Sequence, residues 1–192
     1  MTPVDFFFDP TCPYTWRTSR WIAGVAEAGE AAVTWRLISL AVLNEGKDLP
    51  EEFRPVLAQS ARALRALAAV DDNDGRARLY TALGTRRHEK GLPFTDEEIA
   101  AAVEEAGLPA SVAAAVDDVS LDAAVRASHD EAQAAVGQET GSPVLRIGER
   151  AWFGPVVVPT PTGDEALRLF EAVRLLADVP AFSELKTRRN SF

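Results

Sequence analysis

Hydrophobic and polar positions alternate between strand-like and helical patterns near the two ends of the chain and follow helical patterns alone in the middle. Val4 to Phe8 is a short, nearly continuous apolar run, which favours a buried strand. Asp9 and Pro10 end this run, and apolar residues then recur at helical spacing as far as Gly29. Ala32 to Ser39 is rich in β-branched and aromatic residues and predicts a second strand. Because a helix connects them, we expect two parallel strands in one βαβ unit.

The middle of the chain shows helical patterns from Pro50 to Gly137, with no convincing strand. Strand character returns at Pro143 to Ile147, and a Gly-Glu turn leads from there into a short apolar segment, as in a β-hairpin. A last amphipathic helix follows Thr162. The order β-α-β, helices, β-β-α predicts an α/β fold. In this interpretation residues 1–45 and 138–192 form one domain, and residues 46–137 form an inserted all-helical subdomain.

Composition and charge narrow the class of protein. The chain has 192 residues, of which 47% are hydrophobic and 26% are charged, as in a globular protein with one substantial core. A net charge of −9 disfavours a nucleic-acid partner, and no apolar run reaches the roughly 18 residues of a membrane helix. No signal peptide is visible, and the single cysteine permits no internal disulfide. We therefore expect a cytoplasmic protein in a reducing environment.

The single cysteine lies in the stretch D-P-T-C-P-Y-T-W, between the end of the first strand and the start of the first helix. Pro13 fits the first position of that helix, so Cys12 faces the unpaired N–H groups of the first turn. We expect these groups to hold the pKa of Cys12 below that of a free thiol. Thr15 lies where a Cys-X-X-Cys pair has its second thiol, and its hydroxyl can donate a hydrogen bond to the sulfur. The alternative is that Cys12 is only a small buried apolar residue.

Several stretches of the sequence are similar to a known family. The segment around Cys12, the order of elements, and Ser142 and Pro143 before a strand resemble the DsbA-like branch of the thioredoxin superfamily. The stretches S-R-W-I, S-L-A-V-L-N-E, Y-T-A-L-G and F-G-P-V resemble more closely its mycothiol-dependent nitroreductase subgroup. The resemblance implies a thioredoxin fold, β-α-β … β-β-α, with an inserted helical subdomain.

The resemblance also implies roles for single residues. Cys12 matches the nucleophilic cysteine, and Pro143 matches a proline that follows a cis peptide bond and lies against the active sulfur. Ser142 is expected to present backbone groups to a bound thiol or peptide-like substrate. Thr15 occupies the position of the family's resolving cysteine, so a dithiol–disulfide cycle within the protein is impossible.

The remaining candidates are substrate-contacting residues. The resemblance places His88 in a helix that borders the cleft over the cysteine. Trp16 is the best candidate for a cleft wall, and Pro13 and Tyr14 complete the set expected to touch substrate. His129 is expected to be an exposed helix residue. The two histidines have no metal-binding spacing, so we predict no metal site.

Arg86 and Arg87 form a basic pair that is a further candidate for substrate binding. Two neighbouring arginines can hold an anionic substrate or thiol cofactor, but a solvated helix face is the simpler interpretation.

Three functions from different classes fit these residues. The first is a thiol-dependent oxidoreductase or thiol transferase in which Cys12 forms mixed disulfides and an external thiol resolves them. The resemblance implies mycothiol as that thiol, glutathione is the generic substitute, and no tightly bound cofactor is expected. The second is a cis–trans isomerase that adds Cys12 reversibly to a conjugated double bond of a small-molecule or carrier-bound substrate, as related kappa-class isomerases make plausible. The third is a non-catalytic binding module. We predict the first, in a monomer or homodimer, because the resemblance is to oxidoreductases.

Overall fold

A four-stranded mixed sheet forms the centre of the computed structural model, which describes residues 1–137 and 139–188. In sheet order its strands are β2 (Ala31–Leu37), β1 (Thr2–Phe8), β3 (Val144–Ile147) and β4 (Arg150–Phe153). Strands β1 and β2 are parallel, whereas β3 is antiparallel to both β1 and β4. The predicted βαβ unit and β-hairpin are therefore confirmed.

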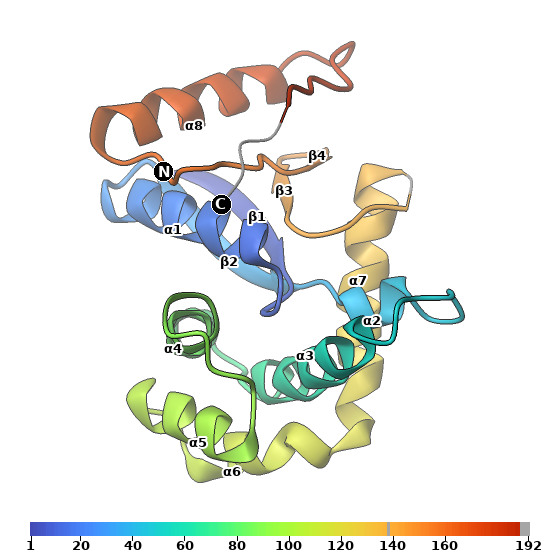
Figure 1. Cartoon of the computed structure of the whole chain (residues 1–192). Helices are drawn as coiled ribbons and strands as arrows, with labels where there is room; N and C mark the ends of the chain where they lie inside the picture. Colours follow the sequence, from blue (N-terminus) through green and yellow to red (C-terminus); the bar gives the residue numbers. More distant parts are fainter. Residues whose placement is uncertain (138, 189–192) are drawn as a thin grey trace.

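Helices α1 (Pro13–Glu27) and α8 (Gly163–Ala177) pack against each other on one side of the sheet (Figure 1). The indole N–H of Trp21 donates a hydrogen bond to the Ala166 carbonyl at 3.0 Å and joins the two helices. Successive residues of β1 point to opposite faces of the sheet. Phe6 and Phe8 accordingly belong to the main core, and Phe7 packs in a second, smaller cluster with residues of α7.

All the regular secondary structure described between β2 and β3 is helical, and Figure 1 shows α3 to α6 gathered below the sheet, with α7 running along its side. The helices in this segment are α2 (Leu40–Leu43), α3 (Phe53–Ala68), α4 (Asn73–Gly84), the π-helical turn η1 (Thr85–Glu89), α5 (Asp96–Glu105), α6 (Ala110–Ala114), the 3₁₀ turns η2 (Ala115–Asp117) and η3 (Val119–Leu121), and α7 (Asp122–Val136). The fold is the predicted thioredoxin fold with an inserted helical segment. The boundaries proposed after residues 45 and 137 stay predictions, and residue 138 lies outside the described part.

Among the described residues, none of the helices has both the length and the apolar character needed to cross a membrane.

Candidate active site

Cys12 is the N-cap residue of α1, with Pro13 in the first turn, and its side chain is only 8% exposed. The thiol donates a hydrogen bond to the carbonyl oxygen of Ser142, with Sγ at 3.5 Å, although 130 positions separate the two residues. They meet because β1 and β3 are neighbours in the sheet. The Ser142–Pro143 peptide bond is cis, so this prediction is confirmed.

A chain of hydroxyl groups lies beside the sulfur. Thr15 is fully buried, and its Oγ1 lies 2.7 Å from Oγ of Ser142. The Ser142 hydroxyl in turn accepts a hydrogen bond from the backbone N–H of Asp9 at 3.0 Å. Because each hydroxyl has one hydrogen, a Ser142 that donates to Thr15 leaves the Thr15 hydrogen for the sulfur of Cys12. The donors in this chain then all point toward Cys12 and favour its anion.

The expectation of a lowered pKa at Cys12 is wrong. Burial raises the pKa of the Cys12 thiol, and the nearby charge of Asp9 acts in the same direction. The Thr15 hydroxyl and the backbone N–H groups of Tyr14 and Thr15 lower the pKa, but they do not overcome the loss of water. The position of Cys12 at the start of α1 correctly predicted the hydrogen-bond donors around the sulfur, but it gave no information on how deeply the sulfur is buried. Cys12 therefore rests as a thiol at neutral pH.

Asp9 is a fully buried carboxylate close to Cys12. It links the two layers of the molecule, which are the sheet with α1 and α8 and the helical layer formed by the inserted helices. Its Oδ1 accepts hydrogen bonds from the N–H (2.8 Å) and hydroxyl (2.6 Å) of Thr11. Its Oδ2 accepts from the N–H of Leu40 (2.8 Å) and the hydroxyl of Ser60 on α3 (2.7 Å). Burial raises the pKa of Asp9, and these four donors act against that effect.

Sequence reasoning treated Asp9 only as the end of the first strand. The signal that could have found it is a carboxylate three positions before the sole cysteine of the chain.

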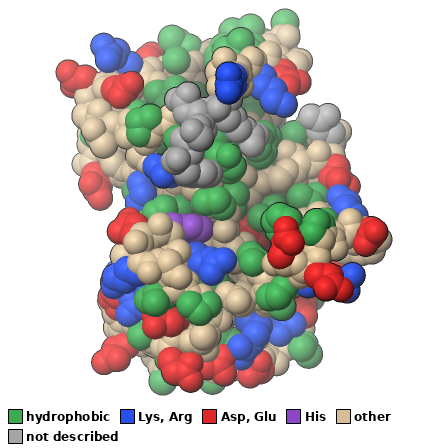
Figure 2. All heavy atoms as spheres, viewed as in Figure 1, with side chains coloured by type: hydrophobic (Ala, Val, Ile, Leu, Met, Phe, Trp, Pro, Cys, Tyr) green, Lys and Arg blue, Asp and Glu red, His purple; other side chains and the backbone are tan. Residues whose placement is uncertain are grey.

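A cavity of about 380 Å³ opens beside the start of α1. Its lining comes from α1, from η1 and from the segment before α8, namely Pro13, Trp16, Arg17, Arg20, His88, Glu89 and Thr160. Figure 2 shows a histidine side chain at the boundary between the upper and lower halves of the molecule, close to hydrophobic and basic side chains. The structure thus places three of the predicted substrate-contacting residues around one cavity.

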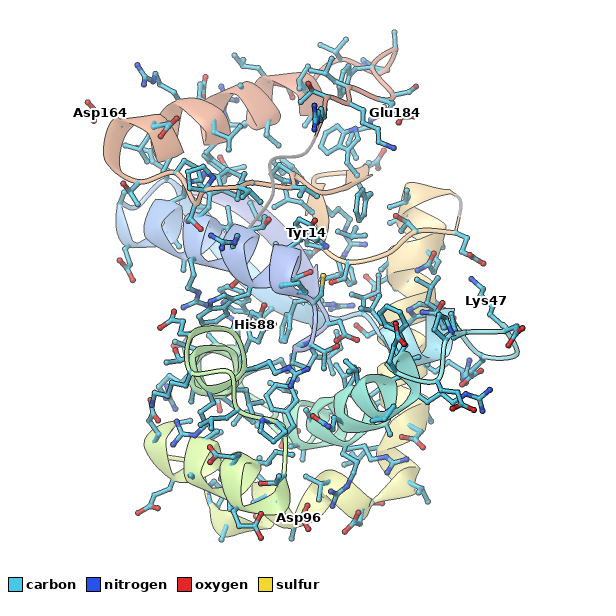
Figure 3. All side chains as sticks on the ribbon, in the orientation of Figure 1. Tyr14, Lys47, His88, Asp96, Asp164 and Glu184 are labelled. Carbon is cyan, nitrogen blue, oxygen red and sulfur yellow. The ribbon has the colours of Figure 1, made fainter. Side chains whose placement is uncertain are left out.

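His88 faces the start of α1 from the layer below it (Figure 3). Its Nε2 lies 2.9 Å from the carbonyl oxygen of Pro10, and its ring stacks on Trp16 with centroids 5.9 Å apart. A carbonyl can only accept, so Nε2 carries the proton and Nδ1 is an acceptor. Burial lowers the pKa of His88 to about 4, and the charge of Arg87 adds to this effect. His88 is therefore neutral at pH 7.

Trp16 is held by the close approach of α4. A Cβ atom at Gly84 would lie 2.1 Å from the indole ring, so only glycine fits there. Tyr80 contacts the same ring edge-on, with centroids 5.8 Å apart. The π-helical turn begins directly after Gly84 and brings His88 onto the indole, and such turns are common at functional sites.

Two other candidates have structural roles. His129 is buried, contrary to expectation, and its Nδ1 accepts a hydrogen bond from the backbone N–H of Ser39 at 3.3 Å. This contact joins α7 to the segment after β2, which the helical pattern around His129 did not reveal. Arg86 forms ion pairs with Glu98 and Glu105, so it does not offer a free charge to a substrate.

The predicted site residues fall into two adjoining groups. Cys12, Thr15, Ser142 and the cis bond before Pro143 meet at the sulfur. The hydroxyl and the carbonyl oxygen of Ser142 are both used within this network. The second group lines the cavity and consists of Pro13, Trp16 and His88. Tyr14, half-buried at the start of α1 (Figure 3), is not part of that lining.

No cluster of three or more metal-ligating side chains occurs among the described residues.

A cysteine at the start of the first helix, held against a cis-proline turn beside a thioredoxin-type sheet, defines a DsbA-like protein of the thioredoxin superfamily. The chain belongs to the Rv2466c-like family, described as mycothiol-dependent nitroreductase Rv2466c, which matches residues 11–187. The uncharacterized protein Rv2286c of Mycobacterium tuberculosis (strain ATCC 25618 / H37Rv) is 35% identical over 189 residues, covering 97% of this chain and 82% of that protein.

Solved structures share the fold at low sequence identity. A 2-hydroxychromene-2-carboxylate isomerase has a TM-score of 0.66 at 15% identity, with 92% of this chain and 95% of that chain covered. The cytosolic disulfide reductase DsbM from Pseudomonas aeruginosa, solved with GSH, has a TM-score of 0.64 at 16% identity, with 90% and 99% covered. Chlamydia trachomatis DsbA has a TM-score of 0.61 at 15% identity, with 92% and 88% covered. At these identities the similarity shows the fold alone.

Proposed function

We propose that the protein is a thiol-dependent oxidoreductase or thiol transferase that reacts through Cys12 alone and uses an external low-molecular-weight thiol. One observation supports this most directly. Cys12 is paired with the hydroxyl of Thr15, at the position where a dithiol protein has the second thiol that resolves a mixed disulfide. Family membership supports mycothiol as the external thiol, with glutathione as the generic substitute. The proposal includes a small-molecule or carrier-bound substrate and a cytoplasmic location, with a monomer or homodimer as the working form.

The proposed cycle is a pair of thiol–disulfide exchanges. Cys12 loses its proton, and its sulfur attacks a substrate disulfide R–S–S–R′. A Cys12–S–S–R bond forms, the R–S–S–R′ bond breaks, and R′S⁻ leaves and takes up a proton. A second thiol, R″SH, then attacks the R sulfur as its thiolate. This step forms R–S–S–R″ and returns Cys12 as a thiolate, so atoms and electrons balance.

The hydroxyl chain has a defined part in this cycle. Cys12 becomes an anion twice, before it attacks and when it leaves. Thr15 can donate to that anion while it accepts from Ser142, and this arrangement requires only a rotation of hydroxyl hydrogens. Because burial raises the pKa of Cys12, the first step is slow at neutral pH and becomes faster as the pH rises.

An isomerase is the second candidate, and the same hydroxyl pair favours it. The sulfur of Cys12 would add to a conjugated double bond, the resulting single bond would rotate, and elimination would restore the double bond. The electron pair of the double bond becomes an enolate that takes up the thiol proton, and elimination returns both the proton and the thiolate. The Thr15 hydroxyl, held by Ser142, can donate to the Cys12 sulfur whenever it is an anion. This chemistry needs no second thiol. The 2-hydroxychromene-2-carboxylate isomerase supports it by analogy of fold alone.

Thiol dependence of turnover separates the two candidates. We expect disulfide substrates to turn over only with added thiol, and we expect Thr15→Cys to relieve part of that dependence by resolving the mixed disulfide internally. Thr18→Cys is the matched control. It lies on the same helix, six positions from Cys12, and about 9 Å of helix rise separates the two residues. That distance is too long for a disulfide. Cys12→Ser should abolish activity.

The opposite results would decide against the proposal. Full turnover of a polyene or enone substrate without thiol would establish the isomerase instead. A Cys12 that forms neither a mixed disulfide with mycothiol or glutathione nor a substrate adduct, measured by mass spectrometry of the intact protein, would favour the binding module.

A further inference from the structure

The cavity beside Cys12 contains a positive charge that has no carboxylate partner in the described chain. Arg20 on α1 donates from Nε to Ser19 Oγ at 3.2 Å and from Nη1 to Thr81 Oγ1 at 3.1 Å. Its Nη2 is buried and has no hydrogen-bond partner. None of the ion pairs between described residues includes Arg20.

Two kinds of partner compensate the charge of other partly buried arginines. Arg65 and Arg86 are paired with carboxylates. Arg76 also has no carboxylate partner, but it donates to three backbone carbonyl oxygens. Arg20 has neither kind of compensation, and burial lowers its pKa. A half-buried guanidinium with unused N–H groups is unfavourable unless an anion completes its surroundings.

The position of Arg20 connects it to the candidate active site. Its guanidinium carbon lies 4.2 Å from the centroid of the Trp16 ring, and both residues line the cavity with Pro13. Arg17 adds a second positive charge to the lining. Glu89 is the one acidic lining residue, and it is exposed to solvent, which weakens its effect on the cavity.

We propose that this cavity binds a carboxylate on the molecule that reacts with Cys12, with Arg20 as its counter-charge. The inference rests on the proposed function in taking Cys12 as the reacting group. Trp16 is four positions from Cys12, which corresponds to about 6 Å of helix rise. Because the guanidinium of Arg20 lies 4.2 Å from the Trp16 ring, a carboxylate bound to it lies roughly 6–10 Å from Cys12 along the helix, and the segment between them crosses the apolar surface of Pro13 and Trp16. Nη2 is shielded from solvent. A bound carboxylate can reach it only if the guanidinium turns toward the cavity, so we expect this rotation on binding.

A matched pair of maleimides tests this inference on the unaltered protein. N-(5-carboxypentyl)maleimide and its primary amide have the same length and differ only in charge. Each adds to the thiol of Cys12 by forming one S–C bond, with the thiol proton transferred to carbon. Because Cys12 is the sole cysteine, the loss of maleimide absorbance reports on this residue alone. We expect the ratio of acid rate to amide rate to exceed the ratio for 2-mercaptoethanol about tenfold, equivalent to about 1.4 kcal/mol.

Two variants assign the effect to Arg20. Arg20→Met keeps much of the apolar stem and should return the ratio to the 2-mercaptoethanol value; a change in the reactivity of the thiol itself affects both probes and cancels in the ratio. Arg168→Met is the charge-matched control, because Arg168 is exposed on α8 and is not part of the cavity lining. It should keep the preference for the acid. A short acid, N-(carboxymethyl)maleimide, cannot span the distance and should show no preference over its amide.

Three results would overturn the inference: an acid-to-amide ratio in the unaltered protein equal to that of 2-mercaptoethanol, an unchanged ratio in folded Arg20→Met, or an equal loss in Arg168→Met. If circular dichroism shows that Arg20→Met does not fold, protection of the unaltered protein decides. Hexanoate should then slow the amide probe more than hexanamide does, and equal protection would refute the site. Alkylation involves no turnover, so these results are independent of whether thiol-dependent activity is found.

Discussion

Replacing Thr15 by valine removes one hydroxyl from the surroundings of Cys12 and changes the shape of the side chain very little. Thr15 is fully buried, and its Oγ1 lies 2.7 Å from the Ser142 hydroxyl. Valine places a methyl group there, so the sulfur loses a hydrogen-bond donor. Ser142 still accepts from the backbone N–H of Asp9. The change therefore tests the donor to the sulfur rather than the packing of α1.

The size of the effect follows from the charge of the acceptor. A hydrogen bond to a charged group contributes about 1.5–3 kcal/mol. One pKa unit corresponds to about 1.4 kcal/mol. Removal of a donor that favours the thiolate should therefore raise the pKa of Cys12 by about 1–2 units, above a value that burial has already raised. At neutral pH the thiolate fraction, and with it the alkylation rate, should fall about 10- to 100-fold.

The assay is the pseudo-first-order rate of iodoacetamide alkylation as a function of pH. The profile of the unaltered protein should have its midpoint above that of an ordinary thiol. Thr18→Val is the matched control, because Thr18 is another fully buried hydroxyl on α1 and donates to the carbonyl oxygens of Tyr14 (3.1 Å) and Pro155 (2.8 Å). It should leave the midpoint unchanged. A Thr15→Val midpoint that does not move, or a shift of the same size in Thr18→Val, would refute the reasoning.

The other predictions concern stability, measured by urea unfolding. Gly84→Ala should lower the free energy of unfolding by about 2 kcal/mol, since the added Cβ meets the Trp16 ring, whereas Gly24→Ala on α1 has open space and should raise it by about 1 kcal/mol. Equal responses would contradict the described packing. Between pH 6.5 and about 4 the unfolded chain takes up a proton that His88 does not, so stability should fall on acidification by roughly 1–3 kcal/mol. His88→Gln should reduce that loss, and an unchanged slope would contradict the burial of His88.

Local patterns were sufficient to predict the strands of the sheet and the helices that flank it, but not which distant segments meet. The run Val4 to Phe8, the proline after Cys12 and the strand after Pro143 each carry a periodic or conformational signal. The fold resemblance then placed Pro143 near the sulfur, as the structure confirms through Ser142.

Burial by distant residues could not be predicted in the same way. The pKa of Cys12 depends on how completely water is excluded by the segments around it, and its position at a helix start does not determine this. His129 lies in a polar stretch, and only the packing of α7 buries it. Two of the partners of Asp9, Leu40 and Ser60, lie 31 and 51 positions away, so the position of Asp9 shortly before Cys12 could not reveal them.

The four hydrogen bonds to Asp9 also couple the segment before α1 to the inserted helices. One carboxylate oxygen is held by Thr11 in the reactive loop, and the other is held by Leu40 and Ser60 in the helical layer. Detachment of that layer would leave a buried carboxylate without half of its donors, at a cost of a few kcal/mol. The loop and the helical layer therefore form one cooperative unit of opening. The amides of Thr11 and Leu40 should therefore show the same change in hydrogen-exchange rate when the stability of the protein is changed. The closed state of the loop would then last as long as the contact between the sheet and the inserted helices.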